Sequence, residues 1–572
     1  MLRLESKKPS LCDSNPVNRN TISRPLAQLN ELAKSCYGPS GRLKQVHNGV
    51  GGCICTTSES NALLSKIPFS HSILKLLSSC VLNHTSRFSD CGLFTTIFCC
   101  SLIENLLKTN SVPSNCGKIF THFLNTCLDY LNADYCRCKL KVDFGSSKTL
   151  LAILRSVITS KPACMLTIKE ADHITAVVLR AFLLTIPDDT EKSTSLGRMI
   201  VIPLEGQQLV DSAVFNGLLV ELPKCQDHKQ FSAVRVPSGY VKVALFGISM
   251  AGELSDVGDG TLEVICDVHP EKATLDQLLV MARQLVNDKV GLVMCQKVIH
   301  PAFKQYLQGC HVIVIDRIGV ALMDPLVQVT GASAIGSFQN CIPSTCYGML
   351  MDVCCLKFGS KQFLHLIPCS GTVSTLVLCS RNETSLNELK RVCHTAEHVL
   401  QLTLRQPLAL LGGGCTETHL ASYIRHQSTS VSDCTLSVLD CSRFEYQIMA
   451  DTFCHSLDSV ARALDHDGSE VLIDDQYGHC WMAQPHPSPY SDWIDMISRC
   501  GCGMHKKQEN MNFKVLGKNN HIVAFEGCSN QTHANTESFV LDCFAGKCNA
   551  LQVAVETANL ILELKYVIKD PN

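Results

Sequence analysis

The sequence has few charged residues and no excess of either sign. Only 18% of its 572 residues are Asp, Glu, Lys or Arg, and the formal net charge is −2. Without a basic excess we expect no binding of nucleic acid, and without an acidic tract we expect no solvating tail. Hydrophobic residues make up 46% of the chain. A chain this long and apolar can bury large cores, so global disorder is excluded and several domains are predicted.

Long apolar segments are also missing. No uninterrupted apolar run approaches the roughly 18 residues needed to span a bilayer, so we expect no direct insertion into a membrane. The first eight residues, MLRLESKK, lack the apolar core of a secretory signal. The Asn-x-Ser/Thr matches at Asn83, Asn382 and Asn530 are then accidental. These absences predict a soluble, intracellular protein.

The 34 cysteines include no pair with the C-x-x-C spacing of most zinc and redox sites. The close pairs are adjacent or alternate in the chain: Cys53/Cys55, Cys99/Cys100, Cys136/Cys138, Cys354/Cys355 and Cys500/Cys502. Because such neighbours do not easily converge on one tetrahedral metal, we interpret most cysteines as small buried hydrophobes in a reducing compartment. A metal or redox role for Cys500, Cys502 and His505 is the minor alternative.

Several catalytic motifs are absent as well. The stretch nearest to a Walker P-loop, 196–199, lacks a Lys followed by Ser or Thr. The cluster of Gly49, Gly51 and Gly52 lacks the strand, the spacing and the acidic partner of a dinucleotide-binding fold. Neither G-x-S-x-G nor H-E-x-x-H occurs, so the hydrolase templates find no support.

Hydrophobic periodicity divides the chain into three parts. The first part predicts helices at 72–82, 93–107, 149–158 and 172–185. The middle part predicts strands at 199–203, 241–246, 290–295 and 311–315, and helices at 275–286, 301–309 and 320–330. The last part predicts helices at 386–405, 443–465 and 550–564, with a polar, loop-rich stretch at 483–535. Alternating strands and helices favour parallel βαβ units. The simplest organisation is an α/β module inserted into a helical domain built from both chain ends.

Three glycine-containing turns, at 37–44, 88–92 and 411–417, could carry chemistry. Glycine lets backbone N–H groups approach a phosphate, and Lys44 adds positive charge. Asp90 could hold Mg²⁺ through one carboxylate oxygen. Each turn also has an ordinary interpretation, as a turn before a helix, an N-cap and a tight connector respectively. The helical histidines His394, His398 and His426 are interpreted as surface residues or satisfied core residues.

Taken in this order, the three turns resemble motifs of the group II chaperonin family. In that family they line an ATP pocket in the equatorial domain. The matching residues are Gly38, Pro39, Gly41 and Lys44 for the turn G-P-x-G-x-x-K, and Gly412, Gly413, Gly414 and Glu417 for G-G-G-A-x-E. Thr330-Gly331-Ala332 matches the apical T-G-A, and 554–562 is similar to the closing equatorial helix. The resemblance covers nearly the whole chain.

The resemblance implies an α+β multidomain fold with three domains. The helical equatorial domain would comprise 1–150 and 406–572. The small intermediate domain would comprise 151–199 and 371–405. The inserted α/β apical domain, which binds substrate in the family, would comprise 200–370.

The departures from the family concern ATP. The family's G-D-G-T-T reads Ser89-Asp90-Cys91-Gly92-Leu93, so Asp90 is kept as a weak Mg²⁺ candidate but both phosphate-binding threonines are missing. The Asp of the family's N-D-G-A-T turn becomes Ser58.

The family's R-S-L-H-D-A carries the Asp that positions the attacking water, and Thr395 replaces it here. A hydroxyl is no general base at neutral pH, and such a loss costs about 10²-fold or more. Glu397, two residues on, would point elsewhere on the helix.

ATP and Mg²⁺ are therefore the implied cofactors, with little or no hydrolysis and no catalytic residue. The vestigial nucleotide-binding candidates are Gly38, Pro39, Gly41, Lys44, Asp90, Gly412, Gly413 and Gly414.

Chaperonin-like chains with eroded pockets are known among the Bardet–Biedl syndrome proteins, and 36–45, 160–167, 295–301 and 410–420 resemble that group. The resemblance implies an assembly factor that binds unfolded or unassembled client subunits. With related chaperonin-like Bardet–Biedl proteins and the cytosolic chaperonin, it would help build the octameric ciliary coat complex, the BBSome. It would support ciliogenesis and reside in the cytosol and at the centrosome or basal body.

Two alternatives stay open. One is a group II chaperonin subunit that folds proteins by its own ATP cycle. The other is a structural centrosomal protein, for which no coiled-coil heptads are present. A polar N-terminal arm, with Asn15, Pro16, Asn18 and Asn20, favours a monomer or a mixed complex over a ring of the family type.

Overall fold

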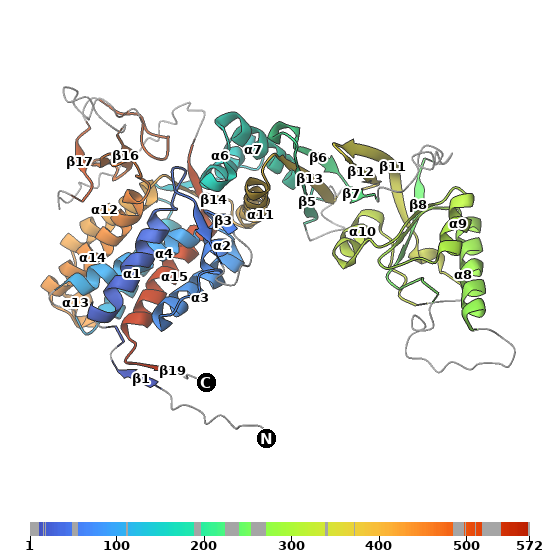
Figure 1. The fold of residues 1–572 in the computed structure, drawn as a ribbon. Helices are drawn as coiled ribbons and strands as arrows, with labels where there is room; N and C mark the ends of the chain where they lie inside the picture. The colour runs from blue at the N-terminus through green and yellow to red at the C-terminus, as the bar shows by residue number, and fades with distance from the viewer. Residues whose placement is uncertain are drawn as a thin grey trace, which may run out of the picture. The chain divides into compact units, whose positions relative to one another are not determined.

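The computed structural model describes residues 11–14, 16–17, 19–47, 55–109, 113–187, 196–222, 239–252, 270–337, 341–370, 372–483, 497, 499–508, 511–517 and 539–569. Asn15, Asn18, Cys53, Asn530 and the glycines at 49, 51 and 52 lie outside them, as does most of 483–535. The chain forms two compact units, one of Met1–Thr175 with Asn382–Asn572 and one of Ala176–Arg381. Figure 1 shows the blue and the orange-red ends of the chain together in the first unit. The finer division into three domains stays a prediction.

The first unit is mainly helical. Its helices are α1 (Arg19–Lys34), α2 (Ser60–Leu64), α3 (Ser72–Phe88), α4 (Gly92–Lys108), α5 (Cys116–Asn132), α6 (Ser147–Thr159), α11 (Glu383–Arg405), α12 (Cys415–Thr429), α13 (Asp433–Leu439), α14 (Arg443–Arg462) and α15 (Phe544–Leu562). Helix α7 (Ile168–Leu183) runs across the boundary to the second unit. The helices predicted at 72–82, 93–107, 149–158, 386–405, 443–465 and 550–564 are confirmed.

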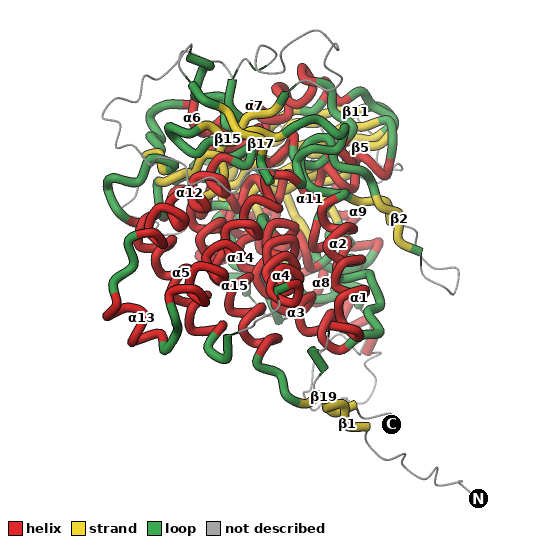
Figure 2. The backbone as a smooth tube through the Cα atoms, turned by 90° about the vertical axis from the view of Figure 1, so that its left-hand side faces the viewer, coloured by secondary structure: helices red, strands yellow, loops and turns green. Residues whose placement is uncertain are grey.

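Helix α4 lies at the centre of this unit, among α1, α3, α14 and α15 (Figure 2). Nearly all of its side chains are apolar or small, and they are buried without a break from Gly92 to Ile103. A helix that is apolar all round needs neighbours on every side. The ring of Phe98 meets that of Phe453 from α14 edge to face, with centroids 5.5 Å apart. This central position fixes the start of α4, which faces the cavity described below.

Short strands connect these helices. They form the sheets β18-β14-β4, β16-β15-β17, β2-β3 and β1-β19. The strands are β1 (Leu11–Ser14), β2 (Lys44–Val46), β3 (Cys55–Thr57), β4 (Lys139–Lys141), β14 (Leu408–Leu411), β15 (Val471–Asp474), β16 (Cys480–Met482), β17 (Phe513–Val515), β18 (Leu541–Cys543) and β19 (Tyr566–Lys569). Strand β1, which precedes the polar arm, pairs antiparallel with β19 near the other chain end.

The second unit contains a six-stranded sheet in the order β10-β9-β8-β11-β12-β7. Its strands are β7 (Leu218–Glu221), β8 (Val241–Phe246), β9 (Val290–Cys295), β10 (Ile313–Ile315), β11 (Gly348–Phe358) and β12 (Lys361–Pro368). Strands β8, β9 and β10 are parallel, as the alternating pattern predicted. The other three pair antiparallel, which the sequence pattern did not indicate. A second sheet joins β5 (Arg198–Glu205), β13 (Val373–Ser380) and β6 (Ala213–Asn216).

Helices cover both faces of the six-stranded sheet. Successive residues of β8 alternate between two hydrophobic clusters, with Val243 in one and Ala244 in the other. Helix α10 (Met323–Thr330) packs in the first cluster, while α8 (Pro270–Asn287) and α9 (Pro301–Gly309) pack in the second. Figure 1 shows α8 and α9 beside β8. Gly331 ends α10 at φ +68°, as its glycine stop predicted.

Among the described residues, we find no helix that combines the length and the hydropathy needed to cross a bilayer.

Candidate functional site

A cavity of about 260 Å³ in the first unit brings the three glycine turns together. Of the nucleotide-binding candidates, Gly38, Pro39, Asp90, Gly413 and Gly414 line it. Gly413 and Gly414 follow β14 and lead into α12, and Asp90 lies in the short turn between α3 and α4. The cavity therefore receives the N-terminal ends of two helices. Since such ends carry partial positive charge and unpaired N–H groups, they favour an anion.

Gly41, Lys44 and Gly412 do not line this cavity. A Cβ at Gly41 would overlap the carbonyl of Cys36, so this glycine serves the turn itself. Lys44 lies in β2, and its Nζ donates to the carbonyl of Arg42 over 3.2 Å. The N–H of Gly412 donates to the carbonyl of Val540 over 2.8 Å. These three residues shape the surroundings of the cavity.

The turn before α4 keeps a left-handed backbone although its glycines are gone. Ser89 and Cys91 stand at the family's two glycine positions and have φ of +59° and +62°. Each costs roughly 1–2 kcal/mol relative to a right-handed conformation. A Cβ at Gly92 would overlap Ser60, so a threonine does not fit at position 92 without rearrangement. The packing around Gly92 therefore leaves no room for the first threonine of the family motif.

Asp90 is paired with a lysine that the sequence did not single out as a site residue. The Nζ of Lys161 lies 3.4 Å from Oδ1 of Asp90, and the two side chains are 12% and 24% exposed. Burial alone would lower the pKa of Lys161, but Asp90 and Glu59 outweigh it, so the pKa is raised. The ammonium is therefore charged at neutral pH. A Mg²⁺ ion at Asp90 would have to share the carboxylate with it.

A second lysine, Lys547 of α15, also lines the cavity. It is fully buried and forms ion pairs with Glu417 of α12 and, over 3.0 Å, with Asp542. It also lies 4.1 Å from the ring centre of Phe94. Burial acts to lower the pKa of Lys547, yet Asp542 and Glu417 raise it well above its usual value. This charge cluster ties the ends of β18 and α15 to α12.

Thr395 lies beside the second turn. It is 7% exposed, and its hydroxyl donates to the carbonyl of Ser89 over 3.4 Å. One turn of α11 further on, Nδ1 of His398 lies 2.7 Å from the hydroxyl of Ser89. No carboxylate stands at the position of the family's Asp. Glu397 instead lies 3.7 Å from His394, in keeping with the expectation that it points elsewhere.

The turn at Ser58 has a structural role. The N–H of Ser58 donates to Oε1 of Glu388 over 2.9 Å, and the hydroxyl of Thr57 donates to both oxygens of the same carboxylate. Glu388 is fully buried and also pairs with Arg391. A carboxylate at position 58 would repel Glu388, so the change from the family's Asp fits this environment.

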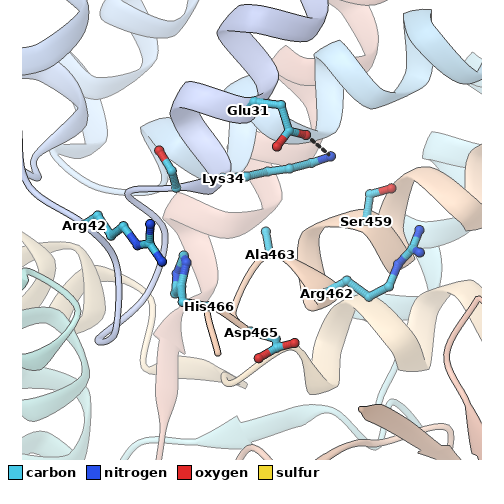
Figure 3. A pocket seen from close by; sticks show the side chains of 9 residues that line it. Glu31, Lys34, Arg42, Ser459, Arg462, Ala463, Asp465 and His466 are labelled. Carbon is cyan, nitrogen blue, oxygen red and sulfur yellow. Dashed lines mark hydrogen bonds and ion pairs between the residues drawn. The ribbon is translucent and has the colours of Figure 1, made fainter. Parts of the chain in front are cut away.

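A second cavity, of about 410 Å³, borders the first turn from another direction. Figure 3 shows its charged lining, with Lys34 paired to Glu31, and Arg42, Arg462 and His466 around it. Nε2 of His466 donates to the carbonyl of Tyr37 over 2.6 Å. Since Tyr37 lines the first cavity, His466 helps to position that wall.

The described cysteines form no disulfide, and more than half of them are buried, as interpreted from the sequence. The expectation that closely spaced cysteines do not converge with other ligands is not met by one pair. The sulfur atoms of Cys500 and Cys502 lie 2.8 Å apart, and Cys415 and His479 join them in one buried group. His505 is adjacent rather than included, and its N–H donates to the sulfur of Cys500 over 3.3 Å.

Sequence reasoning did not assign Lys161, Asp542 or Lys547 to the site. Lys161 lies in a stretch that drew attention only through its family likeness. The available signal was that it is the only charged residue between Arg155 and Lys169. Asp542 and Lys547 lie five residues apart, one before α15 and one inside its apolar first half. A charged residue in such a helix indicates a buried partner.

Comparison with known proteins identifies the family. The model of the TCP-1/cpn60 chaperonin family matches residues 29–572. The chain is similar to "Molecular chaperone MKKS" of Pongo abelii and of Homo sapiens, with 49% and 48% identity over 573 residues and full coverage of both chains in each case. It is 23% identical to "Thermosome subunit alpha" of Sulfolobus acidocaldarius over 419 residues, which cover 70% of this chain and 73% of that protein. The chain belongs to the TCP-1/cpn60 chaperonin family.

Proposed function

We propose that this chain is a chaperonin-like assembly factor that binds unassembled protein subunits and hydrolyses little or no ATP. The observation that carries the proposal is the contrast between the cavity and its surroundings. The cavity walls include residues of the family's glycine turns. Beside the second turn, however, α11 has the hydroxyl of Thr395, bonded to the carbonyl of Ser89, in place of a carboxylate.

The cavity is better suited to binding the phosphate groups of a nucleotide than to hydrolysing them. Two helix N-termini and the ammonium of Lys161 would hold the phosphates, and Asp90 would hold Mg²⁺. Bound Mg²⁺ would neutralise phosphate charge. A water molecule, however, needs a general base, and a threonine hydroxyl with a pKa far above 7 does not supply one. Binding without turnover is the expected behaviour.

The client subunits are those of the ciliary coat complex, and the 176–381 unit carries the binding surface. This part of the proposal rests on family membership, on relatives that are named molecular chaperones, and on the resemblance to the chaperonin-like Bardet–Biedl proteins. Related chaperonin-like subunits and the cytosolic chaperonin are the partners, and the cytosol and the centrosome are the location.

Calorimetry with a non-hydrolysable ATP analogue and Mg²⁺ tests the pocket, together with a sensitive phosphate-release assay on the full chain. We expect measurable binding, weakened in Asp90→Ala, and hydrolysis no faster than a buffer blank. Robust turnover that Asp90→Ala abolishes would overturn the proposal and favour the alternative of an autonomous ATP cycle.

The client assignment needs a separate experiment. The tagged full chain would be isolated gently from ciliated cells, separated by native size and identified by mass spectrometry. Coat-complex subunits and chaperonin subunits in one assembly support the proposal. A homogeneous ring of this chain alone contradicts it. Deleting 200–370 should remove the client subunits while the remaining helical unit keeps its folded circular-dichroism signal.

A further inference from the structure

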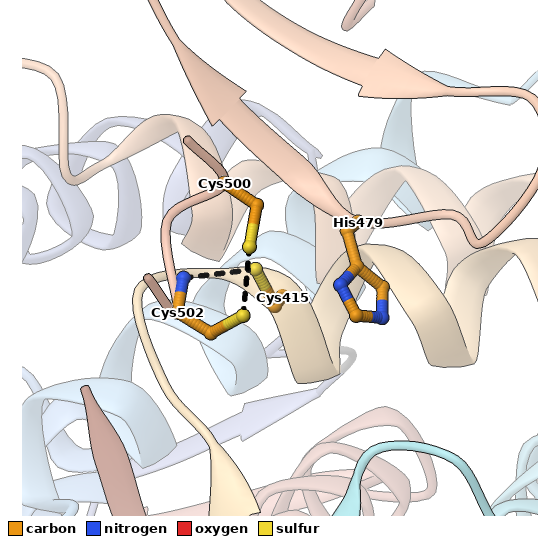
Figure 4. Close-up of side chains that lie close together, drawn as sticks. All are labelled: Cys415, His479, Cys500 and Cys502. Carbon is orange, nitrogen blue, oxygen red and sulfur yellow. Dashed lines mark hydrogen bonds between the residues drawn. The ribbon is translucent and has the colours of Figure 1, made fainter. Parts of the chain in front are cut away.

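Four metal-binding side chains converge at the edge of the glycine turn (Figure 4). Cys415 is the first residue of α12, His479 immediately precedes β16, and Cys500 and Cys502 flank Gly501. Their ligand atoms all lie within 4.8 Å of one another. All four residues are buried, with at most 2% of each exposed. Three thiols and one imidazole without nearby solvent are an uncommon group unless something binds them.

The spacing of the ligand atoms suits a tetrahedral ion. Zn–S bonds of about 2.3 Å and Zn–N bonds of about 2.0 Å place neighbouring ligand atoms roughly 3.3–3.8 Å apart. The observed separations, from 2.8 Å between the sulfur atoms of Cys500 and Cys502 up to 4.8 Å, bracket this range. Small rotations of the side chains would suffice. Three sulfur ligands and one nitrogen are a donor set of closed structural zinc sites.

His479 provides a second, independent observation. Its Nδ1 is buried and has no hydrogen-bond partner, whereas buried polar atoms are nearly always paired. In Figure 4 the imidazole turns a ring nitrogen toward the three sulfur atoms. A metal ion at that place would satisfy it.

Backbone groups support the sulfur atoms. The N–H of Cys502 donates to the sulfur of Cys415 over 3.3 Å, and the N–H of His505 donates to the sulfur of Cys500 over 3.3 Å. Hydrogen bonds of this kind stabilise the negative charge of metal-bound thiolates and orient them. The ring of His505 lies 4.5 Å from that of His479 and restricts its orientation.

We propose that Cys415, His479, Cys500 and Cys502 bind one structural zinc ion. On binding, the three thiols lose their protons to the buffer, and no electron is transferred. The ion would join the glycine turn to the loop around Gly501. The two loops already touch so closely that a Cβ on Gly413 would overlap Gly501, and both residues line the 260 Å³ cavity. Zinc would therefore hold one wall of that cavity in place.

Zinc content of the purified full chain is the direct test. The chain would be produced without a histidine tag and analysed by inductively coupled plasma mass spectrometry. We expect about one zinc ion per chain. Cys500→Ser/Cys502→Ser should lose it. The matched control is Cys136→Ser/Cys138→Ser, another buried alternate pair, whose sulfur atoms lie 3.6 Å apart. Among the residues that the structure describes, this pair belongs to no group of potential metal ligands, so the variant should keep its zinc.

A second measurement avoids reliance on variants that fold poorly. A strong chelator added to the wild-type chain should lower its melting temperature, and added Zn²⁺ but not Mg²⁺ should restore it. Cobalt substitution should give the absorption of a thiolate–cobalt complex. The proposal would be overturned if the purified wild-type chain contained no zinc and the chelator did not change its melting temperature. A Cys500–Cys502 disulfide in the chain purified without oxidant, detected as a loss of two hydrogens in the intact mass, would also overturn it.

Discussion

The ammonium of Lys161 lies 3.4 Å from the carboxylate of Asp90, inside the cavity where the glycine turns converge. Both charges belong to the site, so each controls what the other can bind. A nucleotide phosphate would draw on Lys161, and Mg²⁺ would draw on Asp90. The pair would therefore link phosphate binding at Lys161 to Mg²⁺ binding at Asp90.

Asp90→Asn should destabilise the chain because it leaves the mostly buried Lys161 without its nearest counter-charge. We expect a loss of about 1–3 kcal/mol in the free energy of unfolding, measured by urea denaturation. Asp433→Asn is the control, since Asp433 is 92% exposed in its pair with Arg443, and it should cost less than about 0.5 kcal/mol. Equal effects of the two variants would show that the pair at Asp90 contributes no more than a surface contact.

Thr395→Asp should restore a general base beside the second turn. If the cavity binds Mg-ATP, hydrolysis should rise by up to about 10²-fold over the wild-type chain. Thr395→Asn has the same shape without the charge and should leave the rate unchanged. A phosphate-release assay gives the rates, and melting temperatures confirm that both variants fold. Robust hydrolysis by the wild-type chain would contradict the role assigned to Thr395.

Lys547→Met should destabilise the chain strongly because it leaves the buried carboxylate of Glu417 without a counter-charge. We expect a loss of about 3–5 kcal/mol, and Lys547→Met/Glu417→Gln should recover part of it because both charges leave together. Since the pKa of Lys547 is raised, the stability that depends on its positive charge is present at neutral pH and is lost only as the pH rises above the usual lysine value of 10.5.

The control for that series is Lys361→Met, which breaks an exposed pair with Glu221 at 3.0 Å and should change the free energy of unfolding by less than about 1 kcal/mol. A double variant no more stable than Lys547→Met alone would mean that packing against Phe94, rather than charge, dominates.

Stability should fall as the pH drops below about 6.5, in part through His398. Burial, together with Arg405, lowers the pKa of this imidazole in the folded chain. Between the folded and the unfolded pKa the unfolded chain binds a proton that the folded chain does not, so acid favours unfolding. Urea denaturation at several pH values measures the slope. His398→Gln should reduce this slope.

Local patterns predicted most helices and the parallel strands because each depends on residues close in sequence. The apolar stripe of Phe94, Ile97 and Phe98 predicted α4, and the apolar run at 290–295 predicted β9. Strand β11 was missed although it contains apolar residues, because Met349 and Met351 are exposed and no regular alternation of polar and apolar residues marks its buried face. The family turns were visible because glycine spacing is itself local.

The sequence alone determined the helical and α/β parts, the chaperonin motifs and the loss of the carboxylate at Thr395. Only the tertiary structure decided which side chains meet. Lys161 and Asp90 are 71 positions apart, and Cys415 lies 87 positions before the N–H of Cys502 that donates to its sulfur. A spacing rule describes ligands on one local turn, whereas here the paths of α12, β16 and the loop around Gly501 bring the ligands together. Those paths follow from burial of the whole helical unit, which short-range patterns do not encode.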